Sequence, residues 1–351
     1  MKLKIAGGCG EHGRNCFFVD TDTGSFLVDC GIMQGSDKPF PRLTSDEIRR
    51  LSYVFLTHSH ADHTGAIPWL YENGFYGKVI ASAATLRQLS FPLSNAVSLE
   101  EISSEKRGKI GGIELKYGRA GHCVGSVWYH FFIGEKSVFF SGDYTENSLV
   151  YHCDNIRGRT ADIAVLDCAY GKDTRGFDEY CGELLSKVSE LKVKYKTLVF
   201  PVPKYGRGLD LLKLFGERLP GLICGGDPHF IQQLEKTPKE RFYYKNLDFT
   251  AISSEQEHCD ILFLSDPQLR SETSRNIVEK ILSQGGFAVM TGTVEQGSFS
   301  ERFIRAGKME LLRYPVHQNY NEYMALAEKN NFRCTIPYHS KEFCCESELL
   351  I

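Results

Sequence analysis

The sequence predicts an α/β protein in which one α/β domain is interrupted by a second. Residues 1–172 contain short apolar runs joined by glycine-rich turns, and residues 308–351 return to that pattern. Between them, residues 173–307 alternate helical and strand-like segments, which is typical of a parallel or mixed α/β layer. We therefore assign 1–172 and 308–351 to one domain and 173–307 to an insert.

The first part of the interrupted domain holds most of the predicted strands. A hairpin is expected where 16–20 and 25–29 flank the turn 21–24. Helices are expected at 64–72 and 84–89. The other strand candidates are apolar runs at 53–56, 79–81, 113–117, 126–133, 137–140 and 162–168.

The insert and the returning part are predicted from the same periodicities. The insert has helices at 177–191, 207–214 and 271–282, and strands at 197–200, 261–264 and 287–290. After the insert, strands at 310–314 and 333–336 flank a helix at 321–329.

Composition limits the class of protein. With 42% hydrophobic and 24% charged residues, the chain is typical of globular proteins, and it has no apolar run of membrane-spanning length. Its N-terminus lacks the apolar core of a signal peptide. The twelve cysteines include no CxxC pair, so we expect reduced thiols in a cytoplasmic protein. A net charge of −3 means that any polyanion site must be a local patch.

The stretch Thr57 to His63 holds three imidazoles and a carboxylate directly after an apolar strand. Such donors suit a borderline-soft divalent ion, above all zinc. Because side chains alternate along an extended chain, His58 and His60 point the same way. Asp62 and His63 are adjacent and cannot easily share that ion, so the spacing predicts a second ion. The alternative is a surface loop with chance histidines.

This His-x-His-x-Asp-His stretch resembles the hallmark of the metallo-β-lactamase superfamily. The resemblance implies an αββα sandwich and makes His122 the third histidine and Asp143 the metal-bridging aspartate. Taken alone, either residue would more often be structural. Asp29 ends a strand and matches the family's early aspartate, whose role would be to orient a ligand imidazole. A simple turn aspartate is the alternative for Asp29.

Further segments resemble the β-CASP ribonuclease group, which includes the cleavage and polyadenylation endonuclease and ribonuclease J. The resemblance makes 173–307 an inserted α/β β-CASP domain, Asp167 the acid before it, and His317 and His339 the last two histidine motifs. Asn319 departs from the pattern by replacing an acid, the last motif lacks its Gly-Glu pair, and the insert is short. The segments that carry the resemblance are 7–16, 164–171, 199–212, 290–293, 315–319 and 337–341.

The resemblance implies a dinuclear zinc site, although the same ligands also accommodate Mn²⁺ or Fe²⁺. Two such ions lower the pKa of a water nucleophile and neutralise charge at phosphorus. The catalytic set would be His317, Asp62 and Asp167, with His317 protonating the departing oxygen and Asp167 orienting its imidazole. One ion would be held by His58, His60 and His122 and the other by Asp62, His63 and His339, with Asp143 bridging them.

The implied substrate is single-stranded RNA, bound in a cleft between the domains. His339 is typical of the RNA-cutting members, because DNA-cutting relatives of the Artemis type carry an apolar residue at that position. Ser59 and Ala61 occupy the variable positions of the first motif, and these residues favour an endonuclease over a 5′ exonuclease. Phosphate contacts are expected from five cations, each of which could instead be a solvated surface charge: Lys204, Arg207, Arg157, Arg159 and Arg313.

Two other functions stay open at this stage. One is a small-molecule esterase or lactonase of the same fold, against which the β-CASP-like segments argue. The other is a non-catalytic scaffold subunit of an RNA-processing complex, against which the complete set of seven ligands argues. A homodimer is compatible with the sequence, which identifies no protein partner.

Overall fold

The structure is a computed structural model, which describes all residues except 23, 246–251 and 254–258. The predicted turn 21–24 includes residue 23 and so lies partly outside the described residues. The chain folds into two compact units. The first consists of Met1–Glu146, His152–Thr174 and His317–Ile351, and the second of Asn147–Tyr151 and Arg175–Val316.

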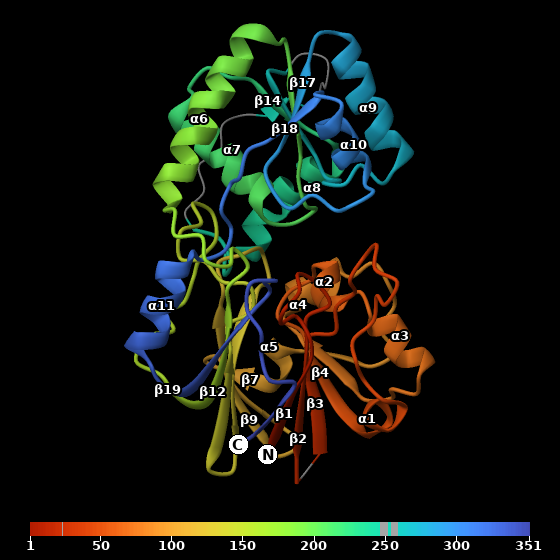
Figure 1. Cartoon of the computed structure of the whole chain (residues 1–351), viewed down its shortest axis with the longest axis vertical. Coiled ribbons are helices and arrows are strands. Elements are labelled where there is room, and N and C mark those ends of the chain that lie inside the picture. Colours follow the sequence, from red (N-terminus) through yellow and green to blue (C-terminus); the bar gives the residue numbers. More distant parts are fainter. Residues whose placement is uncertain (23, 246–251, 254–258) are drawn as a thin grey trace. The chain divides into compact units, whose positions relative to one another are not determined.

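Two seven-stranded sheets form the first unit (Figure 1). The order of the first sheet is β20 (Glu348–Leu350), β1 (Lys2–Gly7), β2 (Cys16–Thr21), β3 (Gly24–Val28), β4 (Leu51–Phe55), β5 (Lys78–Ala81) and β6 (Ala96–Ser98). The order of the second is β19 (Asn331–Tyr338), β12 (Thr160–Asp167), β11 (Lys136–Phe140), β10 (Val127–Ile133), β9 (Ile113–Arg119), β8 (Arg107–Ile110) and β7 (Ser103–Ser104).

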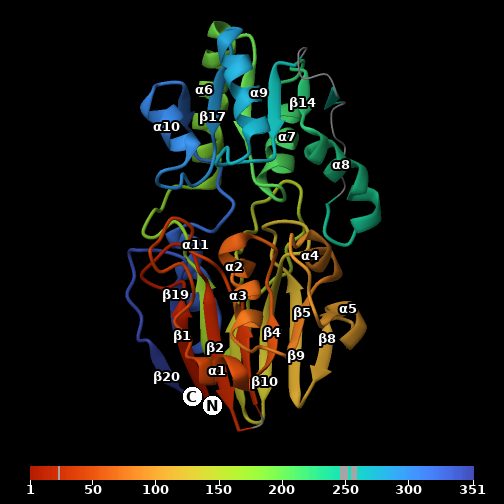
Figure 2. The same ribbon diagram turned by 90° about the vertical axis from the view of Figure 1, so that its right-hand side faces the viewer.

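Helices cover the outer faces of both sheets, as Figures 1 and 2 show. On the first sheet, α1 (Ser45–Arg50) and α3 (Ile67–Glu72) bury Ile48 and Leu70 against strand residues such as Val54. On the second sheet, α11 (Tyr320–Lys329) buries Tyr323 and Leu326. The other helices of this unit are α2 (Ala61–Thr64), α4 (Ala83–Gln88) and α5 (Leu99–Ile102).

The alternation of side chains along each strand explains this layering. On β2, Phe17 and Val19 face the core between the sheets, whereas Cys16 and Phe18 face the helices. Strands that are buried on both faces need near-continuous apolar runs, which is the pattern that the sequence carries. The predicted α/β class and its αββα sandwich are confirmed.

The second unit is built on a six-stranded parallel sheet. Its order is β15 (Ile252–Ser253), β14 (Cys224–Gly226), β16 (Ile261–Leu264), β13 (Leu198–Pro201), β17 (Phe287–Met290) and β18 (Met309–Leu311). The helices of this unit are α6 (Phe177–Lys194), α7 (Arg207–Arg218), α8 (Pro228–Lys236), the 3₁₀ helix η1 (Thr237–Glu240), α9 (Glu272–Ser283) and α10 (Phe299–Arg305). On β13, Val199 packs in the core formed with α9 and α10, whereas Phe200 contacts Phe215 of α7.

The limits of this unit differ from those expected. We placed the end of the insert at 307, whereas the second unit continues to Val316. The reason is that β18 pairs in parallel with β17, so the strand expected at 310–314 adds to the second unit's sheet. The unit also takes in Asn147–Tyr151, from before the expected start at 173.

The cysteines also differ from expectation. Cys9 and Cys345 form a disulfide, with 6.1 Å between their Cα atoms. The expectation of reduced thiols is therefore wrong for this pair, and the other ten cysteines are free. The chain folds back so that its two ends adjoin. β20 pairs with β1 at the sheet edge, and Cys9 forms an isolated β-bridge with Ser340.

No helix in the described part of the chain combines the length and the apolar character that a membrane span requires.

Candidate metal centre

The loop after β4 carries the first ligand candidates. β4 ends in buried Val54 and Phe55, and the Thr57 carbonyl then accepts a hydrogen bond from the Val127 N–H at 2.9 Å, which ties the loop to β10. The helix α2 starts directly after His60, so that Asp62 and His63 lie in its first turn. This local fold gathers four potential ligands on one short segment, of which His58 and His63 are buried.

Asp29 fixes one of these ligands. Its carboxylate accepts hydrogen bonds from the Thr57 N–H at 2.7 Å and the Thr57 hydroxyl at 2.8 Å. It also lies 2.7 Å from His63 Nδ1. Asp29 has a left-handed backbone (φ 59°), which turns the chain at the end of β3 so that the carboxylate reaches the loop. His63 Nδ1–H therefore donates to Asp29, which leaves Nε2 facing the centre.

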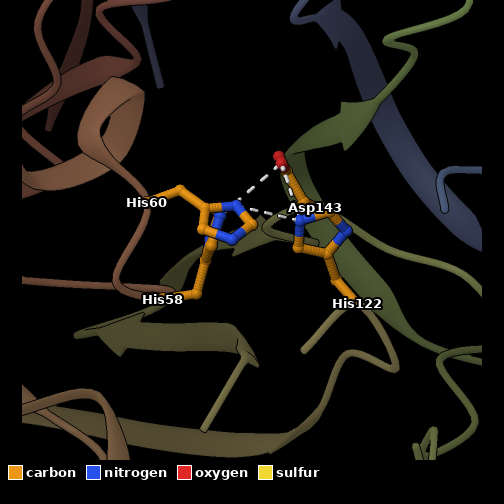
Figure 3. A group of neighbouring side chains, drawn as sticks. All are labelled: His58, His60, His122 and Asp143. Atoms are coloured by element: carbon orange, nitrogen blue, oxygen red, sulfur yellow. Dashed lines mark hydrogen bonds and ion pairs between the residues drawn. The ribbon is translucent and has the colours of Figure 1, made fainter. Parts of the chain in front are cut away.

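Two groups of side chains offer ligand atoms within 4.8 Å of one another. The first consists of His58, His60, His122 and Asp143, whose side chains converge in Figure 3. His58 and His60 come from the loop after β4, His122 from the loop after β9, and Asp143 from the loop after β11. The second group consists of Asp62, His63 and His339, in which His339 Nε2 lies 3.0 Å from Asp62 Oδ2.

Asp143 lies between the two groups, with one oxygen toward each. Its Oδ2 is 3.6 Å from His58 Nε2 and 3.6 Å from His122 Nε2. Its Oδ1 is 3.2 Å from His63 Nε2 and 3.2 Å from His339 Nδ1. This arrangement suits a carboxylate that bridges two cations.

The pKa values reflect the uneven distribution of charge in the centre. Burial and the neighbouring imidazoles hold the pKa of His58 well below its usual value, so this imidazole is neutral, the form that binds metal ions. Burial alone would lower the pKa of His63 and His339. Asp143 and the neighbouring carboxylates outweigh burial, raising the pKa of His63 well above its usual value and that of His339 to about 10. The second group therefore favours positive charge.

These observations fit a bound metal. His58 Nε2 is buried without a hydrogen-bond partner, and its 3.6 Å separation from Asp143 exceeds hydrogen-bond length. A buried nitrogen of this kind is costly unless something binds it. The carboxylates around His63 and His339 favour protonated imidazoles there. The same negative charge would stabilise a divalent cation bound in place of those protons.

Asp167 and His317 form a separate pair beside the two groups. His317 Nδ1 lies 2.8 Å from Asp167 Oδ2, and both residues are buried. Asp167 also accepts hydrogen bonds from the N–H groups of Tyr144 at 2.9 Å and Ala169 at 3.0 Å. These two residues, with Asp143 and His339, make a third group able to hold an ion. An ion bound to Nδ1 of His317 would have to break its hydrogen bond to Asp167.

Three further residues contact the centre, and their roles were not predicted from the sequence. The His12 ring stacks on His339 at 4.3 Å between centroids, and its Nδ1–H donates to the His339 carbonyl at 2.8 Å. Asn15 Nδ2 lies 2.8 Å from His63 Nε2. The Tyr338 hydroxyl donates to Asp143 Oδ1 at 2.9 Å. Tyr338 adjoins a predicted histidine and could have been noticed for that reason.

The backbone of His339 depends on these neighbours. His339 has a left-handed conformation (φ 71°), which is costly for a residue with a side chain. Its N–H donates to the Gly8 carbonyl and its own carbonyl accepts from His12. The loop after β1 thus holds the end of β19 in the conformation that turns the imidazole toward Asp62 and Asp143.

The five predicted RNA-contacting cations fall into both units. In the first unit, Arg157 pairs with Glu146, and the Arg159 guanidinium stacks over Trp128 at 4.2 Å. In the second, Arg207 donates to the Thr291 carbonyl. Lys204 and Arg313 are exposed, and Arg313 Nη1 lies 3.4 Å from the Tyr180 hydroxyl. Their contact with RNA stays a prediction.

The curated relatives of this chain include a transcription termination factor, a probable RNase and an endoribonuclease. The transcription termination factor FttA of Methanosarcina mazei is 31% identical over 173 residues, which cover 41% of this chain and 27% of that protein. The probable RNase MJ4 of Methanocaldococcus jannaschii is 25% identical over 62% of this chain and 57% of its own length. The endoribonuclease YSH1 of Candida albicans is 24% identical over 60% of this chain and 28% of its own length. The chain thus spans less than two thirds of these relatives.

A solved structure and a family model give the fold and the family. A protein of unknown function from Enterococcus faecalis V583 superposes with a TM-score of 0.63 at 10% identity, over 97% of this chain and 94% of that one. The model for the metallo-beta-lactamase superfamily matches residues 9–200, more than half of the chain. The three curated relatives fall in the β-CASP ribonuclease group, as the motifs implied. The chain belongs to the metallo-β-lactamase superfamily.

Proposed function

We propose that this protein is a metal-dependent ribonuclease that hydrolyses phosphodiester bonds of single-stranded RNA at a dinuclear zinc centre. The observation that supports this most is the Asp143 carboxylate, whose two oxygens face two separate groups of imidazoles. The names of the relatives, an endoribonuclease and a probable RNase among them, support RNA as the substrate.

The ligands would divide as the two groups do. When bound, two such ions act as Lewis acids toward the phosphate and lower the pKa of a water nucleophile. Asp29 would keep His63 in the tautomer whose Nε2 carries the lone pair that an ion would bind, because Nδ1–H is committed to the Asp29 carboxylate. Asp143 would bridge, and the remaining ligands would be His58, His60 and His122 on one side and Asp62, His63 and His339 on the other.

His317 would protonate the departing oxygen. Its Nδ1–H donates to Asp167, so the proton that can be transferred would be carried on Nε2. The Asp167 carboxylate would stabilise the imidazolium, and its hydrogen bonds to Tyr144 and Ala169 would keep it in position. Cleavage on the 3′-oxygen side would leave a 3′-hydroxyl and a 5′-phosphate. We propose internal cutting rather than digestion from the 5′ end, on the basis of the Ser59 and Ala61 filling of the first motif.

The test uses purified protein and single-stranded RNA with either a 5′-triphosphate or a 5′-monophosphate, labelled at the 3′ end. Internal products that do not depend on the 5′ group are expected. Stepwise shortening of the labelled RNA from its 5′ end, seen only with the monophosphate, would reject the endonuclease assignment. His58→Ala combined with His60→Ala should abolish cutting and remove one of two ions in elemental analysis.

The same preparation separates the other functions. A chromogenic ester assay beside the RNA assay tests for an esterase or lactonase. Elemental analysis showing only traces of transition metal, with no cutting of RNA, would favour a scaffold subunit. Reloading with Zn²⁺, Mn²⁺ or Fe²⁺ after chelation identifies the ion that restores the highest rate.

A further inference from the structure

A carboxylate that bridges two ions must keep both oxygens in place. Asp143 follows Gly142, which has a left-handed backbone (φ 56°), in the loop after β11. Rotation of the carboxylate about its side-chain bonds would turn one oxygen away from its imidazoles. The four imidazoles within 3.6 Å of it are proposed ion ligands. With ions bound, their lone pairs point at the metals, so they cannot hold the carboxylate by hydrogen bonds.

Tyr338 offers Asp143 a hydrogen bond from a group that is not an imidazole. Its hydroxyl donates to Oδ1 at 2.9 Å. A neutral hydroxyl can donate to one lone pair of Oδ1 while another faces an ion.

The hydroxyl is held rigidly. Tyr338 is 2% exposed, and its ring packs edge-on against Phe17 at 5.3 Å in the core between the sheets. It ends β19, in register with Asp167 on β12. The Cys168 N–H donates to the Tyr338 carbonyl at 3.1 Å. The sheet therefore fixes the position of the phenol independently of any ion.

We propose that Tyr338 is a positioning residue of the metal centre, whose hydroxyl fixes the Asp143 carboxylate with one oxygen toward each group of ligands. This inference rests on the proposed function, since it requires bound ions. Because the hydrogen bond is made to Oδ1, its loss should affect the ion of Asp62, His63 and His339 more than the ion held by three histidines. Orienting partners of metal ligands commonly contribute about 10–100-fold to metal affinity.

The test is Tyr338→Phe, which removes only the hydroxyl. Zinc affinities of the full chain without RNA are measured by competition with a chromogenic zinc chelator, which reports both ions. We expect one ion, the one assigned to Asp62, His63 and His339, to lose about 10–100-fold in affinity and the other ion to change much less. Thermal unfolding of the zinc-free protein is followed in parallel.

Tyr117→Phe is the matched control. Tyr117 is a buried tyrosine of the same core, and its hydroxyl lies 3.0 Å from the Ser103 hydroxyl, away from the proposed ligands. It should keep both zinc affinities. Unchanged affinities in Tyr338→Phe, or equal losses at both ions, would overturn the role of Tyr338. A wild-type chain that binds no zinc would instead overturn the proposed function itself, and this inference with it.

Discussion

His317 differs from His58, His63, His122 and His339 in its distance to Asp143. Its Nδ1 atom is committed to Asp167 at 2.8 Å and lies 3.9 Å from Asp143, whereas each of those four proposed ligands turns a nitrogen toward Asp143 at 3.2 or 3.6 Å. The sequence motif alone could not separate an acid from a ligand. His317 also belongs to the third group of residues able to hold an ion. Measuring the metal content of a variant is therefore needed to distinguish a general acid from a ligand.

His317→Ala should keep two zinc ions and much of the RNA affinity. The cleavage rate should fall by about 10²–10⁴-fold, the usual contribution of a positioned general acid. Rates come from single-turnover cleavage, and metal content from elemental analysis. Asp167→Asn should lower the rate less, because it weakens only the orienting hydrogen bond. His339→Ala is the contrasting variant and should release the second ion. Loss of metal from His317→Ala would make His317 a ligand.

At the scale of elements, α11 shows why one departure from the family pattern is tolerated. Asn319, which stands where the family has an acid, caps this helix. Its side chain accepts from the Glu322 N–H at 2.9 Å, and the Glu322 carboxylate accepts from the Asn319 N–H at 2.8 Å. The helix in turn buries Tyr323 and Leu326 on the second sheet. The structure thus gives Asn319 a role at the start of this helix.

Asn319→Ala should therefore lower the free energy of unfolding by about 1 kcal/mol, because it leaves the first-turn N–H groups of α11 without a cap. Asn319→Asp should be nearly neutral, since aspartate caps equally well. Urea unfolding measures both, and zinc content should not change in either. A loss of zinc in Asn319→Ala alone would show that the residue supports the centre.

In the second unit, α7 carries a buried carboxyl group with a raised pKa. Asp210 accepts hydrogen bonds from the Ser148 hydroxyl at 2.9 Å and the Leu149 N–H at 2.7 Å. Burial outweighs these bonds and raises the pKa of Asp210 from 3.8 to about 6. The folded state thus binds the proton more tightly than the unfolded state does. Stability from this group is fully present below about pH 4 and is lost as pH rises through about 6.

Asp210→Asn should remove this pH dependence. Between pH 5 and pH 7.5, the wild type should lose stability relative to the variant, by about 1–2 kcal/mol over that range. The measurement is urea unfolding at several pH values, followed by a probe in the second unit. Comparing the two proteins cancels the titration of other groups. Parallel curves for both would contradict a raised pKa of Asp210.

At the scale of the whole molecule, charge bears on substrate choice. The net charge is −3, so RNA binding must rely on local cations, two of the predicted ones in the first unit and three in the second. Binding that neutralises phosphates releases counterions and weakens with salt. The proposed dinuclear chemistry acts on phosphorus and does not by itself distinguish RNA from DNA.

We expect single-stranded RNA to be cut faster than duplex RNA or single-stranded DNA of the same sequence. Affinity should fall linearly with salt on logarithmic axes, with a slope of about −0.7 for each phosphate neutralised. Binding and cleavage assays at several salt concentrations test both points. Equal or faster cutting of single-stranded DNA would reject the preference for RNA.

The sequence by itself determined what is encoded locally. The apolar runs predicted the strands of the sandwich, because strands buried on both faces need such runs. The motif from His58 to His63 placed four candidates within six residues, and the spacing to Asp143 and His339 matched a family pattern. The structure brings these residues together, while their roles stay predictions.

Only the tertiary structure decided which distant residues support the centre. His12 meets His339 across 327 positions, and Tyr338 meets Asp143 across 195. The pairing of Cys9 with Cys345 and the addition of β18 to the second unit's sheet were equally hidden. Such contacts depend on which strands pair, and periodicity along the chain does not identify the partner of a strand that lies far away in the sequence. Local chemistry can be predicted from neighbouring residues, but a supporting contact exists only once the sheets have formed.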